Sequence, residues 1–256
     1  MNAAIAKMNL FLHGASDFNV MQGDTLRDPK ILQGGNIAKF DCVIANPPFS
    51  LENWGATEWS SDKYKRNIYG TPSDSCGDYA WIQHMICSMV SGQGRMAVVM
   101  PQGILFRNQE TEIRKQLVES DLIEAVVTLG DKLFYGTGLS PCFLIIRRMK
   151  PAHHSGRILM IDGSKILTQK RAQNILEEND IDRLYSLYQN YSDEEDYSRI
   201  VTLQEIRDKE YNLSPNRYVV YHKEEIRPYA EVLAEFKHAY EEVKRLEEEF
   251  SLLINA

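Results

Sequence analysis

The sequence lacks the features of membrane-spanning, secreted and metal-binding chains. No apolar run in its 256 residues approaches the roughly 18 needed to span a membrane, and residues 1–7 lack the apolar core of a signal peptide. The four cysteines are far apart and form no Cys-x-x-Cys, so neither a disulfide framework nor a zinc site is expected. We expect a soluble, cytoplasmic protein. Its reduced cysteines should serve as packing residues: Cys42, Cys76, Cys87 and Cys142.

Positive charge is also scarce, and acidic residues are concentrated in the C-terminal part. Residues 1–176 carry 19 Lys and Arg against 16 Asp and Glu, a net +3, whereas residues 177–210 carry 4 against 11, a net −7. Non-specific DNA affinity comes mainly from neutralised phosphates. A chain with a formal charge of −7 would therefore bind DNA poorly alone, and any role on DNA implies a partner.

Short β-rich apolar runs alternate with helix-like stretches through residue 148. This alternation is typical of an α/β domain with a largely parallel sheet. We expect a helix before Asn9 and further helices over Asp78–Val90 and Glu110–Glu119. The expected strands are Phe18–Met21, Phe40–Ala45, Arg95–Met100, Ile123–Leu129 and Pro141–Arg148.

The connection between the last two of these strands is too short to hold a crossover helix. These strands should therefore pair antiparallel as a hairpin, giving one antiparallel strand at the end of the parallel sheet. We assign residues 1–150 to this domain. Residues 151–222 form its extension, with a strand at Arg157–Ile161 and an acidic, mostly helical stretch around Ile181–Tyr188.

The last segment, residues 223–256, is predicted to form one long amphipathic helix. Its apolar residues are spaced alternately three and four apart, which is typical of a heptad seam. A helix that packs on its own domain would show the same periodicity. The seam residues are Tyr229, Val232, Phe236, Ala239, Val243, Leu246, Phe250 and Leu253.

The most informative segment is Asp41-Cys42-Val43-Ile44-Ala45-Asn46-Pro47-Pro48-Phe49, a buried-strand run that ends in a rigid polar turn. Open α/β sheets bind ligands at the carboxyl ends of their strands. There the Asn46 amide oxygen and the Pro47 carbonyl would accept both hydrogens of a planar NH2 group. Methyl transfer to such an amine requires its lone pair to leave ring conjugation, and two fixed acceptors favour that change. Asn-Pro-Pro can also form a plain loop turn, but the preceding strand favours the methyltransferase interpretation.

The tetrapeptide Asn46-Pro47-Pro48-Phe49 resembles the catalytic motif of amino-group methyltransferases. Several further segments resemble the modification subunits of type I restriction-modification systems, and they occur in the family's order across nearly the whole chain. These segments are Met8-Asn9-Leu10-Phe11-Leu12-His13-Gly14, Gly23-Asp24-Thr25-Leu26, Gln83-His84-Met85, Ala97-Val98-Val99-Met100-Pro101-Gln102-Gly103-Ile104-Leu105-Phe106, Phe134-Tyr135-Gly136-Thr137-Gly138 and Tyr211-Asn212-Leu213.

This resemblance implies a Rossmann-like, S-adenosylmethionine-dependent methyltransferase sheet that methylates adenine N6 in duplex DNA. Asn46, Pro47, Pro48 and Phe49 match the catalytic positions, and the flipped adenine would stack on Phe49. Direct transfer implies no metal. The implied partners are DNA, a specificity subunit that faces the C-terminal helix, and a restriction subunit, with a second modification subunit as a further candidate.

The resemblance also implies a cofactor pocket around Asp24. Its carboxylate would accept a hydrogen bond from the cofactor's adenine amine, with Thr25 and Leu26 lining the same pocket and Asn46 close to the cofactor. Apart from the resemblance, Asp24 could simply cap a turn.

The chain departs from the family pattern because it lacks, upstream of Met8, a strand and the glycine-rich loop for the cofactor's methionine end. Gly92-Gln93-Gly94 and Gly136-Thr137-Gly138 follow the catalytic turn and precede strands, so neither has the position of such a loop. We therefore expect an incomplete sheet with a bare hydrophobic edge. The chain could be a remnant, an expression fragment or half of a split enzyme completed by an upstream fragment. Alone, it should bind S-adenosylmethionine weakly or not at all.

Two other functions remain open. The chain could be a non-catalytic module that docks on a specificity subunit, or the same turn could methylate cytosine N4 or a protein glutamine amide. The type I-like segments outside the tetrapeptide disfavour the second alternative.

Overall fold

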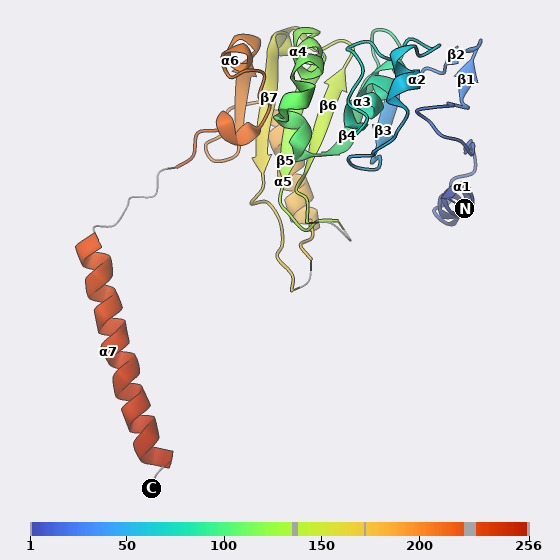
Figure 1. The fold of residues 1–256 in the computed structure, drawn as a ribbon. Helices are drawn as coiled ribbons and strands as arrows, with labels where there is room; N and C mark the ends of the chain where they lie inside the picture. Colours follow the sequence, from blue (N-terminus) through green and yellow to red (C-terminus); the bar gives the residue numbers. More distant parts are fainter. Residues whose placement is uncertain (1, 135–137, 172, 223–228, 255–256) are drawn as a thin grey trace. The chain divides into compact units, whose positions relative to one another are not determined.

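The computed structural model describes residues 2–134, 138–171, 173–222 and 229–254, and for a few positions of the last helix only the backbone (Figure 1). The chain divides into two compact units, one up to Tyr221 and one from His222 onward. Within the described residues, no helix is long and apolar enough to cross a membrane.

A six-stranded mixed sheet forms the centre of the first unit (Figure 1). Its order is β3 (Cys42–Ala45), β4 (Arg95–Pro101), β6 (Pro141–Arg147), β5 (Ile123–Leu129), β7 (Arg157–Gly163) and β8 (Ser198–Thr202). β3 is parallel to β4 and β5 is parallel to β7, while β6 and β8 run antiparallel to their neighbours. A separate two-stranded ladder joins β1 (Leu32–Gln33) to β2 (Asn36–Ile37).

Helices cover both faces of the large sheet. Figure 1 shows α4 on the near face and α5 on the far one. The helices are α1 (Asn2–Leu12), α2 (Ala56–Ser60), α3 (Asp78–Cys87), α4 (Thr111–Glu119), α5 (Glu178–Asn190), α6 (Leu203–Asp208) and α7 (Tyr229–Ile254). The short 3-10 helices are η1 (Gln102–Leu105), η2 (Asn108–Glu110), η3 (Ala152–His154) and η4 (Pro215–Arg217).

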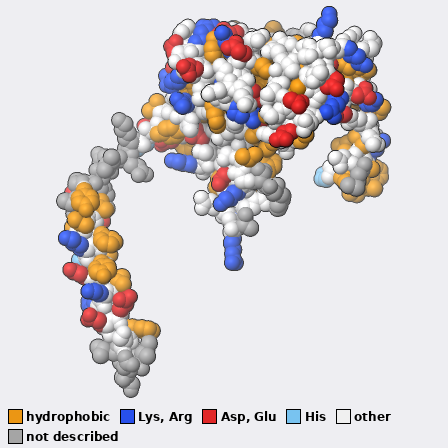
Figure 2. All heavy atoms as spheres, in the orientation of Figure 1, with side chains coloured by type: hydrophobic (Ala, Val, Ile, Leu, Met, Phe, Trp, Pro, Cys, Tyr) orange, Lys and Arg blue, Asp and Glu red, His pale blue; other side chains and the backbone are white. Residues whose placement is uncertain are grey.

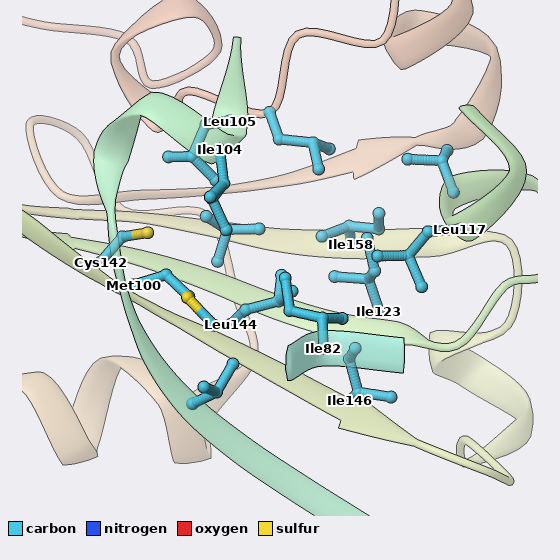
Figure 3. Close-up of a cluster of buried hydrophobic side chains, with 14 of the residues drawn as sticks. Ile82, Met100, Ile104, Leu105, Leu117, Ile123, Cys142, Leu144, Ile146 and Ile158 are labelled. Carbon is cyan, nitrogen blue, oxygen red and sulfur yellow. The ribbon is translucent and has the colours of Figure 1, made fainter. Parts of the chain in front are cut away.

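The core is split by the sheet into two hydrophobic clusters. Along β7, Ile158 and Met160 face the cluster that includes Ile82 of α3, whereas Leu159 and Ile161 face the cluster beneath α5. This two-residue alternation is the periodicity of a strand buried on both faces. Figure 3 shows the larger cluster, where Ile82 lies against the side chains of the neighbouring strands. α3 is therefore firmly held on the sheet.

Most of the predicted elements are confirmed. Strands form within or close to the ranges expected at 40–45, 95–100, 123–129, 141–148 and 157–161, and helices form near 2–9, 78–90, 110–119 and 181–188. The hairpin of β5 and β6 is antiparallel as predicted, although residues 135–137 of its connection lie outside the described residues. β6 is not at the end of the sheet, however, because it inserts between β4 and β5. The strand β8 and the ladder of β1 and β2 were not predicted.

The strand expected at Phe18–Met21 is a wrong prediction. The structure has irregular backbone there, and Phe18 and Met21 are exposed by 38% and 53%. β3 is the terminal strand of the sheet, and within the described residues no strand pairs with its outer edge. Residues 18–21 therefore have no neighbouring strand to complete a ladder, and an isolated strand is not stable.

The outward face of β3 is also uncovered. Ile44 is 77% exposed, and Cys42, which we expected to be a packing residue, is exposed as well. Val43 and Ala45 on the opposite face pack against the core beneath α3. The long hydrophobic edge expected from a strand at residues 18–21 does not form, and the bare apolar surface is instead the outward face of β3.

The second unit contains the helix α7. Its seam residues are exposed, from 46% at Val232 to 79% at Tyr229, and Figure 2 shows apolar side chains along the helix with charged ones among them. The predicted helix is confirmed, whereas the side chain of Leu253 and the linker 223–228 lie outside the described residues.

Candidate active site

The catalytic turn predicted from the sequence lies at the carboxyl end of β3, where Ala45 pairs with Val98 of β4. The two prolines at the end of β3 make a continued ladder unfavourable. Asn46 and Pro48 are exposed, Pro47 is buried and Phe49 is half-buried. The polar side chain at the end of the strand is thus accessible to a ligand.

An aromatic pair stands beside this turn. The ring of Phe49 meets the ring of Phe134 edge to face, with centroids 6.2 Å apart and an interplanar angle of 81°. Phe134 belongs to the segment between β5 and β6, which is more than 80 residues away in sequence. The geometry is favourable for two aromatic rings and fixes the orientation of Phe49.

The first residue of α3 anchors the catalytic turn. Asp78 is fully buried, and its Oδ1 accepts a hydrogen bond from the backbone N–H of Ser50 at 2.7 Å. Its Oδ2 accepts one from Arg107 Nη2 at 2.6 Å. Ser50 has a φ of 49° and directly follows Phe49, so this contact holds a backbone position that L-residues rarely adopt.

Arg107 and Glu110 complete this buried charge cluster. Arg107 Nε donates to Glu110 Oε2 at 2.9 Å, and Glu110 is 2% exposed. Burial opposes the charge of Arg107, but its hydrogen bond to Asp78 and the charge of Glu110 prevail and raise its pKa. Burial raises the pKa of Glu110, despite the nearby guanidinium. The cluster keeps a positive partner beside Asp78.

The turn that begins at Asp24 is built by its own carboxylate. Asp24 Oδ1 accepts hydrogen bonds from the backbone N–H groups of Leu26 and Arg27, both at 3.0 Å. Asp24 and Thr25 are exposed, and the second carboxylate oxygen lies 3.8 Å from Arg27 Nη1. Leu26 points the other way, is 3% exposed and packs with Trp54 and Trp59. Asp24 therefore caps the turn through one oxygen, and its other oxygen accepts no hydrogen bond from the turn's backbone.

Arg66 holds the same turn from its carbonyl side. It is 1% exposed and donates to the backbone oxygens of Thr25 at 2.9 Å and Leu26 at 2.6 Å. Two hydrogen bonds to Asp62, at 3.0 and 2.7 Å, balance its charge, and its guanidinium lies 4.5 Å from the ring centroid of Trp59.

His84 of α3 is the remaining partner of Arg66. Its Nδ1 lies 3.1 Å from Arg66 Nη1. Burial, reinforced by the charge of Arg66, lowers the pKa of His84 to about 4. The Nδ1 of a neutral ring can accept a hydrogen bond from the guanidinium N–H, so this contact connects the Asp24 turn to α3.

The structure brings the two turns together through one small cluster. Leu26, Trp54, Trp59 and Ala80 of α3 form its buried part, and Leu51, two residues after Phe49, packs against it. The side chain of Arg27 also donates to the backbone oxygen of Asn53. Packing and this bond thus connect the predicted cofactor turn to the segment that follows the predicted catalytic turn.

A profile of known sequences decides the family. The N-6 DNA methylase profile matches residues 1–226, which is most of the chain. The chain belongs to the N-6 DNA methylase family. The resemblance to type I modification subunits is thereby confirmed.

Relatives of this N-6 DNA methylase support the same assignment. The chain is 36% identical over 96% of its length to the type I restriction enzyme MjaVII methylase subunit of Methanocaldococcus jannaschii, and 30% identical over 84% to the HindI methylase subunit of Haemophilus influenzae. The crystal structure of a type I methyltransferase subunit from Streptococcus thermophilus superposes on 85% of the chain with a TM-score of 0.77 and 29% identity. The chain covers 44%, 49% and 46% of these proteins, so it spans less than half of their length.

The residues of this N-6 DNA methylase fit S-adenosylmethionine in part. The carboxylate of Asp24 has an oxygen left to accept from an amine, and Thr25 beside it is exposed, which suits the adenine end. No glycine-rich loop precedes the turn in this sequence to wrap the methionine end. The side chain of Leu26, which we expected to line the cofactor pocket, is buried against Trp54 and Trp59.

Sequence reasoning gave no site role to six residues, although two of them, His84 and Phe134, lie in segments that resemble the family: Asp78, Arg107, Glu110, Arg66, His84 and Phe134. Asp78 and Glu110 carried a usable signal, because each begins a predicted helix and acidic residues are favoured in the first turn. The others act through long-range contacts, which leave no local pattern in the sequence.

Proposed function

We propose that this chain supplies the catalytic part of a DNA adenine-N6 methyltransferase, the modification subunit of a type I restriction-modification system. The observation that carries the proposal is the Asn46-Pro47-Pro48-Phe49 turn at the carboxyl end of β3, held by Asp78 and adjoining the Asp24 turn. The membership in the N-6 DNA methylase family supports the same reaction.

In this proposal the turn binds and activates the amine of a flipped adenine. The Asn46 amide oxygen and the Pro47 carbonyl accept the two N6 hydrogens and stabilise the positive charge that the nitrogen gains as the new N–C bond forms. Phe49 stacks on the base, and Phe134 keeps its ring in place. The methyl group would come from the sulfonium of S-adenosylmethionine, with loss of its S–C bond, and the amine would lose one proton to solvent. The products would be N6-methyladenine and S-adenosylhomocysteine.

The 256 residues offer a partner to one end of the cofactor. S-adenosylmethionine would supply the methyl group when bound, and Asp24 would accept a hydrogen bond from its adenine amine. The methionine end would be held by residues outside these 256, for which an upstream segment or a second modification subunit is the candidate. The outer edge of β3, with Ile44 77% exposed, is where strands of that segment would add to the sheet.

The remaining partners follow from α7 and from the charge of the chain. The exposed seam of α7 would pack against helices of a specificity subunit that reads the DNA sequence, with a restriction subunit joining the same complex. The net charge of −7 agrees with DNA binding that depends on those partners. We propose the cytoplasm as the place of this reaction. The seam also supports a second candidate function, a docking module without catalysis.

A complementation assay tests the proposal. The chain is mixed with the portion of the MjaVII methylase subunit outside the aligned segment and with the MjaVII specificity subunit, a mixture we call the complemented enzyme. Labelled S-adenosylmethionine and DNA are added, and the nucleosides are analysed by mass spectrometry. N6-methyladenine is the expected product. N4-methylcytosine, a labelled protein or no product would reject the proposal, and complex formation without any product would favour the docking module.

A further inference from the structure

We infer that α3 is the common positioning element of the site, with Asp78 at its start fixing the catalytic turn and His84, through Arg66, fixing the cofactor turn. The inference rests on the proposed function, because it assigns a separate catalytic consequence to each contact. Asp78, Arg66 and His84 are positioning residues, since they act on the turns and not on the reacting atoms.

The contact at Asp78 controls where Phe49 and Asn46 lie. Ser50 is the next residue after Phe49, and its N–H is bound by a carboxylate that is fully buried. A second bond joins the N–H of Gly77, just before α3, to the backbone oxygen of Leu51. The turn is thus tied to α3 on both sides of Ser50, while Arg107 keeps the carboxylate paired. A charge-assisted bond of this kind is stronger than one between neutral groups.

The contact at Arg66 controls the Asp24 turn independently. Arg66 binds the two carbonyls of the turn, whereas Asp24 binds two of its N–H groups. Both sets of bonds are needed to fix the direction of the second Asp24 oxygen, which lies 3.8 Å from Arg27 Nη1. No residue of the Asp78 cluster takes part in these bonds. Besides α3, the two turns share the packing of Leu26 on Trp54 and the bond from Arg27 to the backbone oxygen of Asn53.

α3 is rigid enough to serve both turns. Ile82 and Ile86 have no exposed surface, and the hydroxyl of Tyr79 donates to the backbone oxygen of Ile104 at 2.9 Å. Gln83 accepts from the N–H of Tyr69 at 2.7 Å and donates to the oxygen of Gly70 at 3.0 Å. A helix locked in this way sets the spacing between the two turns.

Kinetics of the complemented enzyme separate the two contacts. Asp78→Asn keeps the size of the side chain but removes its charge, so the catalytic turn loosens and we expect kcat to fall at least about tenfold with KM for S-adenosylmethionine unchanged. Arg66→Lys keeps the charge but replaces three separate donor nitrogens by one, so the forked contacts to Asp62 and the two carbonyls are lost. For this variant we expect KM for S-adenosylmethionine to rise about tenfold, with kcat at saturation unchanged.

The matched control is Glu124→Gln on β5. Glu124 is a buried carboxylate, 2% exposed, that also pairs with an arginine, Arg147 at 3.1 Å. It lies near the amino end of β5, whereas the catalytic turn follows the carboxyl end of β3. This variant should lose stability but keep both kinetic constants.

Hydrogen exchange of the chain alone gives a readout that does not need catalysis. Asp78→Asn should speed exchange in residues 46–53 and leave residues 24–28 unchanged, and Arg66→Lys should do the reverse. Two results would overturn the inference. One is that kcat and KM for S-adenosylmethionine both change in each variant, and the other is that each variant speeds exchange in residues 24–28 as well as in residues 46–53. A wild-type complemented enzyme without methyl transfer would reject the proposed function itself, which distinguishes the two failures.

Discussion

Asn46 combines an exposed side chain with a rigid backbone at the end of β3, so its amide can serve a ligand without being needed for folding. We predict that Asn46→Ala lowers kcat of the complemented enzyme by about 10²–10³, the usual effect of removing one group that stabilises developing charge. The free energy of unfolding should change by less than about 0.5 kcal/mol. Asn190→Ala, an exposed asparagine of α5, is the control and should change neither quantity. Equal activity of the two variants would contradict this role.

His84 makes the stability of the chain depend on pH. Its pKa is about 4 in the folded chain, because of burial and then Arg66, whereas an unfolded histidine has a pKa of about 6.5. The unfolded chain therefore binds the proton more readily below pH 6.5, and the stabilising contribution, complete above that pH, is lost as the pH falls toward 4. The expected loss between pH 7 and pH 5 is on the order of 2 kcal/mol.

The variant His84→Asn isolates this effect, because asparagine offers an acceptor to Arg66 but does not titrate. Urea unfolding at pH 7 and pH 5 should show a smaller decrease for the variant than for the wild type. The same decrease in both chains would mean that His84 is not the group that titrates.

Single residues differ in how far the sequence revealed them. The position of Asn46 at a strand end could be predicted because it belongs to a contiguous motif, Asn46-Pro47-Pro48-Phe49, that directly follows an apolar run. Asp78 and Arg66 could not, since their roles depend on Ser50, Thr25 and Leu26, which lie 28, 41 and 40 residues away. Burial of a charged side chain is a property of the fold and not of its neighbours in sequence.

At the scale of elements, the strands buried on both faces were the easiest to predict. β5 is buried at all seven positions and its sequence is a continuous β-rich run. β8 was missed because it lies in an acidic, polar segment and pairs only with β7. Residues 18–21 show the opposite case, in which an apolar run forms no strand without a partner.

The helix α7 offers the most direct test at this scale. We predict that Phe236→Asp weakens binding to a specificity subunit by about 30-fold, which corresponds to about 2 kcal/mol for one buried aromatic side chain. Phe236 is 67% exposed, so the melting temperature of the chain should not change. Lys237→Asp, on a polar face of the same helix, is the control for added negative charge. Calorimetry that finds equal affinities for both variants would contradict the seam as an interface.

For the whole molecule, the unpaired edge of β3 predicts a difference between the chain alone and the complemented enzyme. Ile44→Ser should cost less than about 0.5 kcal/mol in the chain alone, because Ile44 is 77% exposed. The same change should weaken assembly with the complementing segment, since Ile44 would become buried there. Ile146→Ser, at a position with no exposed surface, should instead cost about 2–5 kcal/mol in the chain alone. Unchanged assembly of Ile44→Ser would place the added strands elsewhere.

We propose that these 256 residues hold the catalytic turn and a partner for the adenine end of the cofactor, and that residues outside them bind its methionine end. Calorimetric titration of S-adenosylmethionine tests it most directly, first into the chain alone and then into the chain with the complementing segment. We predict no measurable binding by the chain alone, binding when the segment is added, and weaker binding when Asp24→Ala replaces the wild type. Micromolar binding by the chain alone, or binding by the assembled pair that Asp24→Ala leaves unchanged, would contradict the claim.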